Sequence, residues 1–166
     1  ELANGKIKVI DTSGHAPHHQ SYLFDKYLLI GEAAGVNIPL RGKTYIRPAT
    51  PPVFNYEVSK SNIQKLLDGD LGAKKICYAH YGMKDDVDSM LNVAKDQLAK
   101  WVQVISEFID SKNEPDYFEK VKSELKRKDA YFANIDYLDK NKRENEFFFV
   151  NNSIRGITDY LEKKKS

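Results

Sequence analysis

The chain has 166 residues, of which 41% are hydrophobic and 30% are charged, and its net charge is only +2. This is the composition of a folded soluble protein with one sizeable core, and the near-neutral charge excludes a strong electrostatic footprint for nucleic acid. No apolar run approaches the roughly 18 residues of a membrane span, and no secretory signal is visible. The single cysteine, Cys77, excludes a disulfide framework within the chain. We therefore expect a cytoplasmic protein with no nucleic-acid or membrane partner.

The first residues contain Asn4-Gly5, the preferred dipeptide of a tight hairpin turn. Such a turn needs a strand on each side, yet only residues 1–3 precede it. We therefore expect this chain to have been cut from something longer. A glycine in an ordinary loop is the alternative explanation.

Alternating apolar and polar residues predict a half-buried strand over residues 6–11. Two short apolar runs, 21–24 and 27–30, are joined by Asp25-Lys26 and predict a hairpin. The segment that follows, GEAAGVNIPLRGKTYIRPATPP, is rich in glycine and proline, and we expect it to be largely loop.

A short helix is predicted over residues 59–67, with Ser59 or Ser61 as its cap and an end near Gly69. Residues 75–79, which include Cys77, then predict a buried strand. In that setting we expect the Cys77 thiol to be buried and inert.

From residue 84 the pattern becomes helical. Apolar residues recur at steps of three and four up to residue 109, which predicts a long amphipathic helix. Further helices are predicted over 116–128, 130–138 and 146–161. Trp101 and the aromatic run 147–149 could line a ligand pocket, but we expect them to pack between helices.

Three of the four histidines lie in the stretch DTSGHAPHHQSYLF, residues 11–24. His15 follows the first predicted strand, Glu32 closes a later one, and His80 closes the strand after that. Ligand-type residues at the ends of three successive strands can converge on one point, and two histidines with a carboxylate are a known ligand set for zinc and non-haem iron. The alternative is that each is a surface or hydrogen-bonded side chain.

The same segments resemble motifs of the metallo-β-lactamase superfamily. DTSGHAPHHQSYLF is similar to its third motif, usually T-P-G-H-T-x-G-H, while LLIGEAAG looks like the next, a strand ending in Gly-Asp. CYAHYG looks like the last, and YIRPATPP is similar to a branch of uncharacterised hydrolases. The resemblance covers roughly residues 1–83. It implies an α+β fold in which half of an αββα metallo-β-lactamase sandwich is followed by an all-helical carboxy-terminal region, residues 84–166.

Carried over onto this chain, the resemblance makes His15 a metal ligand and places Glu32 where an aspartate usually bridges two metals. His80 becomes the ligand of the second metal, and His19 a supporting residue behind the ligands. His18 has no role in the family pattern, and we expect it to be solvent-exposed. The cofactor implied is zinc, with two ions in the whole enzyme, and iron or manganese are the alternatives.

The implied activity is that of a metal-dependent hydrolase, in which metal-bound hydroxide attacks an ester, thioester or similar bond of a small-molecule substrate. Nothing in the chain matches the family's H-x-H-x-D-H motif, so we expect a fragment that is inactive alone. An amino-terminal half or a second chain, with a homodimer among the options, would then supply the missing ligands. One half of a two-chain enzyme, or a binding or assembly module with a degenerate metal site, are the alternatives.

Three further residues are candidates for the pocket. Arg47 either meets an anionic substrate or is an ordinary surface arginine. Tyr22 and Tyr81 flank ligand positions, and either line the pocket or pack normally.

Overall fold

The computed structural model describes residues 5–165. The predicted Asn4-Gly5 turn depends on residue 4, which lies outside the described residues. Within the described range the fold is α+β, as expected, with two sheets and five α-helices.

The larger sheet has five strands in the order β1-β2-β3-β6-β7. These are β1 (Ile7–Asp11), β2 (Gln20–Phe24), β3 (Tyr27–Gly31), β6 (Lys75–Tyr78) and β7 (Met83–Lys84). The hairpin predicted at Asp25-Lys26 is confirmed, and Asp25 adopts the positive φ of 51° that such a turn favours. Because β3 and β6 are parallel, their carboxyl ends lie at the same edge of the sheet.

The expectation of a long loop after Glu32 was wrong. Two antiparallel strands, β4 (Val36–Leu40) and β5 (Lys43–Arg47), form a separate ribbon that turns at Gly42, where φ is 72°. In β4 the apolar residues Val36, Ile38 and Leu40 alternate, but Pro39 and the flanking glycines conceal the pattern, and β5 has no such alternation. Pro39 is tolerated because each strand of a two-stranded ribbon has a free edge.

The helices are α1 (Tyr56–Asp68), α2 (Val87–Glu107), α3 (Tyr117–Lys128), α4 (Ala130–Ala133) and α5 (Lys140–Lys165), with 3₁₀ turns η1 (Ile109–Ser111) and η2 (Asn134–Tyr137). The long helix predicted after residue 84 is confirmed as α2. The cap predicted for α1 was wrong, because Asn55 accepts the Val58 N–H and starts the helix earlier. α5 begins at Lys140, before the predicted residue 146. The prediction missed the start of the helix because its first residues are polar and show no apolar stripe. Across the described residues, no helix combines the length and apolar character that crossing a bilayer requires.

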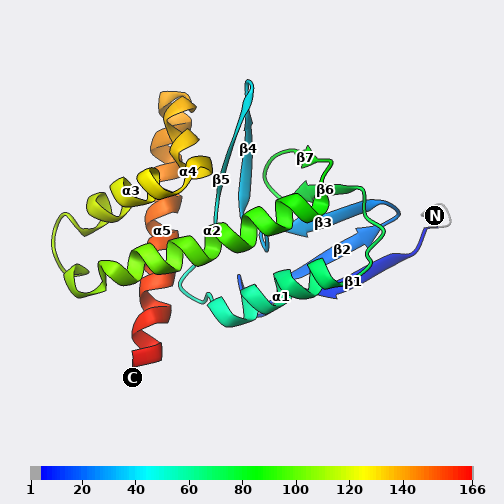
Figure 1. Cartoon of the computed structure of the whole chain (residues 1–166), viewed down its shortest axis with the longest axis horizontal. Coiled ribbons are helices and arrows are strands. Elements are labelled where there is room, and N and C mark those ends of the chain that lie inside the picture. Colours follow the sequence, from blue (N-terminus) through cyan, green and yellow to red (C-terminus); the bar gives the residue numbers. More distant parts are fainter. Residues whose placement is uncertain (1–4, 166) are drawn as a thin grey trace.

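One hydrophobic core runs from the larger sheet into the helical half. Leu28, Ile30 and Ile76 are fully buried on one sheet face, and the same cluster continues to Trp101, also fully buried. The packing expected for Trp101 is therefore confirmed. Figure 1 shows α2 extending from the sheet to the helical region, where α5 crosses it. The division of the chain into domains at residues 83 and 84 stays a prediction.

The opposite face of the larger sheet carries apolar side chains that remain exposed. The strand register places Val9, Tyr22, Leu29, Cys77 and Met83 opposite one another across all five strands. Val9 is 54% exposed, Leu29 43% and Met83 49%. We call this row of five residues the exposed sheet face. Its character is that of a surface that packs against another layer.

Candidate metal centre

His15, Glu32 and His80 meet at one edge of the larger sheet. β1 and β3 both pair antiparallel with β2, and β3 is parallel to β6, so the three strands share one direction. Their carboxyl ends therefore deliver all three side chains to one place. His15 Nε2 lies 3.2 Å from Glu32 Oε2, and His80 Nε2 lies 3.1 Å from Glu32 Oε1. The Glu32 carboxylate thus spans two imidazoles, with one oxygen facing each.

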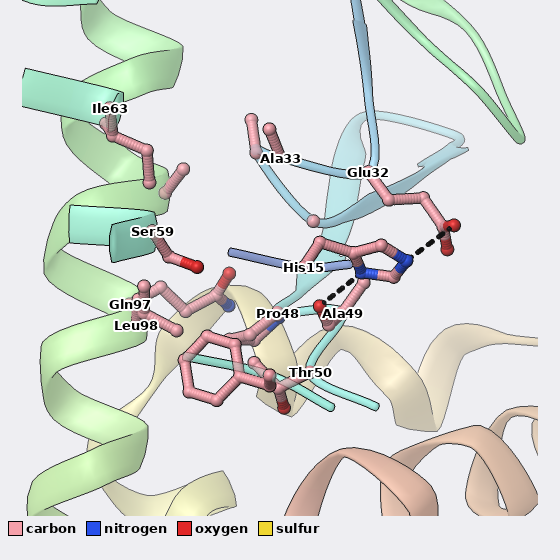
Figure 2. Close-up of a pocket in the computed structure, with 14 residues that line it drawn as sticks. His15, Glu32, Ala33, Pro48, Ala49, Thr50, Ser59, Ile63, Gln97 and Leu98 are labelled. Atoms are coloured by element: carbon pink, nitrogen blue, oxygen red, sulfur yellow. Dashed lines mark hydrogen bonds and ion pairs between the residues drawn. The ribbon is translucent and has the colours of Figure 1, made fainter. Parts of the chain in front are cut away.

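The His15 ring is oriented by a backbone carbonyl. Its Nδ1 donates a hydrogen bond of 2.8 Å to the Ala49 oxygen, and both contacts of the ring are drawn in Figure 2. A carbonyl can only accept, so Nδ1 carries a proton and Nε2 points toward Glu32. Metal-binding histidines commonly make this kind of contact through their second nitrogen.

The charges of this pair are set by mutual contact. The hydrogen bond from His15 is the main cause that lowers the pKa of Glu32 to about 2, against the opposing effect of burial. Burial lowers the pKa of His15, but its bonds to Glu32 and Ala49 outweigh burial and raise that pKa overall. The contact therefore favours the ionised carboxylate of Glu32 and the protonated form of the His15 imidazole.

His19 supports Glu32 from behind through a hydrogen-bond chain. His19 Nε2 accepts the Glu32 backbone N–H at 3.0 Å, and His19 Nδ1 lies 2.9 Å from Thr12 Oγ1. Thr12 Oγ1 lies 2.8 Å from Ser21 Oγ, which donates to the Ile30 carbonyl at 3.0 Å.

This chain of bonds has one consistent direction. The Ile30 carbonyl can only accept, so Ser21 donates to it, Thr12 donates to Ser21, and His19 Nδ1 donates to Thr12. His19 is therefore neutral. Burial, followed by the nearby charge of His15, lowers its pKa and favours the same state.

The loop that carries His80 is held by a residue that no sequence pattern singled out. Asn37, fully buried on β4, donates a hydrogen bond of 2.8 Å from Nδ2 to the Tyr81 carbonyl. Gly82, with φ of 74°, turns the chain beside it. Asn37 lies 44 residues from Tyr81, in a segment expected to be loop, so no local pattern could have indicated this contact.

Comparison with known proteins relates the chain to one fold. No protein-family model matches it. It is 31% identical over 83 residues to the metallo-beta-lactamase fold-containing protein ST1585 of Sulfurisphaera tokodaii, a match that covers 50% of this chain and 30% of that protein. The crystal structure of ST1585 aligns with a TM-score of 0.48 at 26% identity, over 61% of this chain and 36% of that one.

A second solved structure covers nearly the whole chain. The metallo-beta-lactamase family protein TTHA1429 from Thermus thermophilus aligns over 99% of this chain with a TM-score of 0.59, at 17% identity. The chain carries part of a metallo-β-lactamase fold. It spans 46% of TTHA1429 and less than a third of the curated relative. The likeness to TTHA1429 includes the helical half, which the motifs did not cover.

The other candidate residues take different places around this candidate centre. His18 is exposed, as predicted. Tyr22 belongs to the exposed sheet face, and Cys77 is half-buried there, where burial raises the pKa of its thiol. Arg47 fits neither expectation, because it is buried and its Nε lies 2.6 Å from Glu146 Oε2. The sequence could not reveal that partner, which lies 99 residues away.

A cleft of about 360 Å³ opens in front of the centre. One side is formed by strand ends and loops that contribute His15, Glu32, Arg47 and Tyr81, and the other by α5. The contribution of α5 consists of Glu146, Phe149, Asn152 and Ser153. Packing was expected for all of the aromatic run 147–149, yet Phe149 lines this cleft.

The three side chains are of types that bind metal ions, but their donor atoms do not surround a single point. Two imidazole nitrogens and a carboxylate are zinc-type ligands. Within residues 5–165, however, no three His, Cys, Asp or Glu side chains are grouped so as to hold one ion. Because each Glu32 oxygen faces a different histidine, the three side chains form two donor pairs rather than one group. A metal held by either pair would need further ligands from elsewhere.

Proposed function

We propose that the protein is a metal-dependent hydrolase in which His15, Glu32 and His80 form one side of a two-ion centre. The observation that carries this proposal is the Glu32 carboxylate, whose two oxygens face the Nε2 atoms of His15 and His80 at 3.2 and 3.1 Å. A bridging carboxylate with one histidine on each side is suited to holding two ions close together. Zinc is the proposed metal, because imidazole and carboxylate are among its common ligands.

When bound, such ions would supply Lewis acidity and lower the pKa of coordinated water. The residues of this chain hold the centre in shape. Ala49 fixes the His15 ring, His19 holds the backbone of Glu32, and Asn37 holds the loop that carries His80. This second layer of hydrogen bonds keeps the ligands in one geometry, which metal sites of this kind require.

The missing ligands are proposed to come from a second β-sheet that packs on the exposed sheet face. That face is apolar across all five strands, whereas the opposite face is already covered by the core. Its edge leads directly to the half-filled centre at the strand ends. A partner sheet with an apolar inner face and histidine or aspartate residues at its own edge would both bury the face and complete the coordination.

Metal titration of the chain tests the proposed centre. Co²⁺ absorbs visible light according to its ligands, so its binding can be followed directly, and Zn²⁺ can then be measured by competition. We expect His15→Ala and His80→Ala each to remove one binding event and Glu32→Ala to weaken both. His18→Ala is the matched control, because His18 is exposed in the same loop. Binding that is unchanged in all three variants of the centre would contradict the proposal.

Hydrolysis is tested by supplying the second sheet. We would search for the H-x-H-x-D-H motif in two places. These are the reading frame that encodes the chain and the proteins that co-purify with it. We expect ester or thioester hydrolysis only when the two parts are combined, and its loss in His15→Ala. A combined protein that binds metal yet hydrolyses neither class would favour a binding or assembly role.

A further inference from the structure

Helix α5 is fixed against the cleft at three points. At Glu146, a carboxylate oxygen accepts from Arg47 Nε at 2.6 Å and from the Tyr45 hydroxyl at 3.1 Å. One turn beyond Phe149, the Ser153 carbonyl accepts from the Thr50 hydroxyl at 2.9 Å.

The third point is Gly156, where the helix backbone touches the loop. A Cβ atom there would collide with the carbonyl oxygens of Thr50 and Pro51. These contacts leave α5 little freedom to move, so the side chains that it turns toward the cleft form a wall of defined shape.

Two residues of this wall are available to a ligand. Phe149 and Asn152 line the cleft between the anchors at Glu146 and Ser153, and Phe149 is 47% exposed. The Arg47 guanidinium packs 5.6 Å from the centre of the Phe149 ring and limits its movement. Tyr81, which is 50% exposed, lines the same cleft beside His80. Because these rings are not buried in the protein core, their apolar surface is available to a ligand in the cleft.

The α5 side of the cleft offers no free cation to an anionic group. Arg47 is the one arginine or lysine among the lining residues in the described chain, and it is 5% exposed and paired with Glu146. Its charge is therefore neutralised inside the protein. Glu32 is likewise paired, with His15 and His80 on the other side of the cleft.

We propose that Phe149 and Asn152 select the substrate of this centre by binding a neutral group that carries a flat apolar body and an amide or carbonyl. Phe149 contacts the apolar body, and the Asn152 amide both donates to and accepts from the polar group. The inference rests on the proposed hydrolase, for which it names the uncharged substrate class. The non-reacting part of the substrate lies against α5, while the scissile bond faces His15 and His80.

Ligand-observed NMR tests the wall without the metal. Acetanilide, a neutral aromatic amide, and benzoate, an anion of similar size, are titrated into the full chain in buffer that contains a chelator. We expect acetanilide to bind at least about tenfold more tightly than benzoate, and Phe149→Ala to weaken acetanilide by about tenfold or more. Phe149→Leu should restore part of the loss, and Asn152→Ala should weaken acetanilide but not toluene. Tyr137→Ala is the matched control, because Tyr137 is an exposed aromatic residue that does not line the cleft.

Each result decides between the two proposals. No acetanilide binding, equal or tighter binding of benzoate, or an equal loss in the Tyr137 and Phe149 variants would overturn the inference about the wall. None of these results touches the metal centre, since the titration contains no metal. Conversely, if the chain combined with its second sheet binds no Co²⁺ while acetanilide still binds selectively, the proposed hydrolase is removed and a neutral-ligand site on α5 remains.

Discussion

His19 holds Glu32 by its backbone: His19 Nε2 accepts the Glu32 N–H at 3.0 Å, while His19 Nδ1 is fixed by Thr12. His19, to which the resemblance gives a supporting role behind the ligands, therefore uses both ring nitrogens for hydrogen bonds. Its effect on the centre is indirect, through the position of the Glu32 carboxylate.

Replacing His19 should weaken metal binding without removing a ligand. We expect His19→Ala to lower the Co²⁺ affinity by about 10- to 100-fold, the usual cost of losing such a supporting contact. His19→Gln should recover part of this loss, because a glutamine oxygen can accept the Glu32 N–H. Competition with a chelator measures both, with His18→Ala as the control. Equal affinity in the wild-type and His19→Ala proteins would show that this bond does not position Glu32.

The buried pair of Arg47 and Glu146 predicts a strong coupling. Arg47→Met leaves a buried carboxylate without its cation, and we expect a loss of about 3–5 kcal/mol in the free energy of unfolding. The double variant Arg47→Met, Glu146→Leu should be more stable than Arg47→Met alone, because no buried charge is left unpaired. Urea denaturation measures the free energy of unfolding of Arg47→Met, of Glu146→Leu and of the double variant. If the losses of the two single variants simply add, the pair is not coupled.

Asp129 is a second buried carboxylate with four donors. Its side chain accepts from Gln97, Trp101 and the backbone N–H groups of Tyr131 and Phe132. We expect Asp129→Ala to cost at least about 3 kcal/mol of stability, because several buried donors lose their acceptor. Asp86→Ala removes an exposed helix cap instead and should cost only about 1 kcal/mol. Thermal unfolding compares the two, and equal losses would contradict the importance of the buried network.

Gly156 offers a prediction whose sign is opposite to helix propensity. In the interior of an exposed helix, glycine to alanine gains about 1 kcal/mol. At Gly156 the added Cβ meets the carbonyl oxygens of Thr50 and Pro51, so we expect Gly156→Ala to destabilise the protein by about 1–3 kcal/mol. Asn145→Ala, an exposed change in the same helix, should leave stability equal or slightly higher. Chemical denaturation decides, and a stabilised Gly156→Ala protein would mean that α5 does not touch the loop.

The exposed sheet face should bind apolar probes in the isolated chain. We expect the dye ANS to fluoresce with the wild-type chain, and Val9→Glu with Leu29→Glu to reduce the signal by about half or more, because carboxylates interrupt the apolar row and repel the anionic dye. Tyr137→Glu changes an exposed aromatic residue in the helical half and should leave the signal unchanged. Circular dichroism verifies that the variants are folded. A signal that is lost equally in both would place the dye elsewhere.

Local patterns in the sequence were sufficient for several elements of this protein. Alternation marked the strands around Asp25, and three- to four-residue steps marked α2, because each pattern reflects which side chains of one element are buried. The order of His15, Glu32 and His80 at strand ends was enough to expect their convergence. The sheet then shows the physical basis, because β1, β3 and β6 run in the same direction and end at the same side.

Tertiary structure alone decided the rest. The ribbon pairs β4, whose alternation glycine and proline obscured, with β5, which has none, and Asn37 of β4 reaches a loop that lies 44 residues away. Arg47 and Phe149 acquired their roles only when α5 packed across the cleft, with Glu146 lying 99 residues after Arg47. Such contacts depend on which surfaces remain apolar after each element forms, and on how a helix fits against a loop at Gly156. Periodicity along the chain does not encode that fit, whereas the placement of His15, Glu32 and His80 at strand ends follows from the strands that precede them.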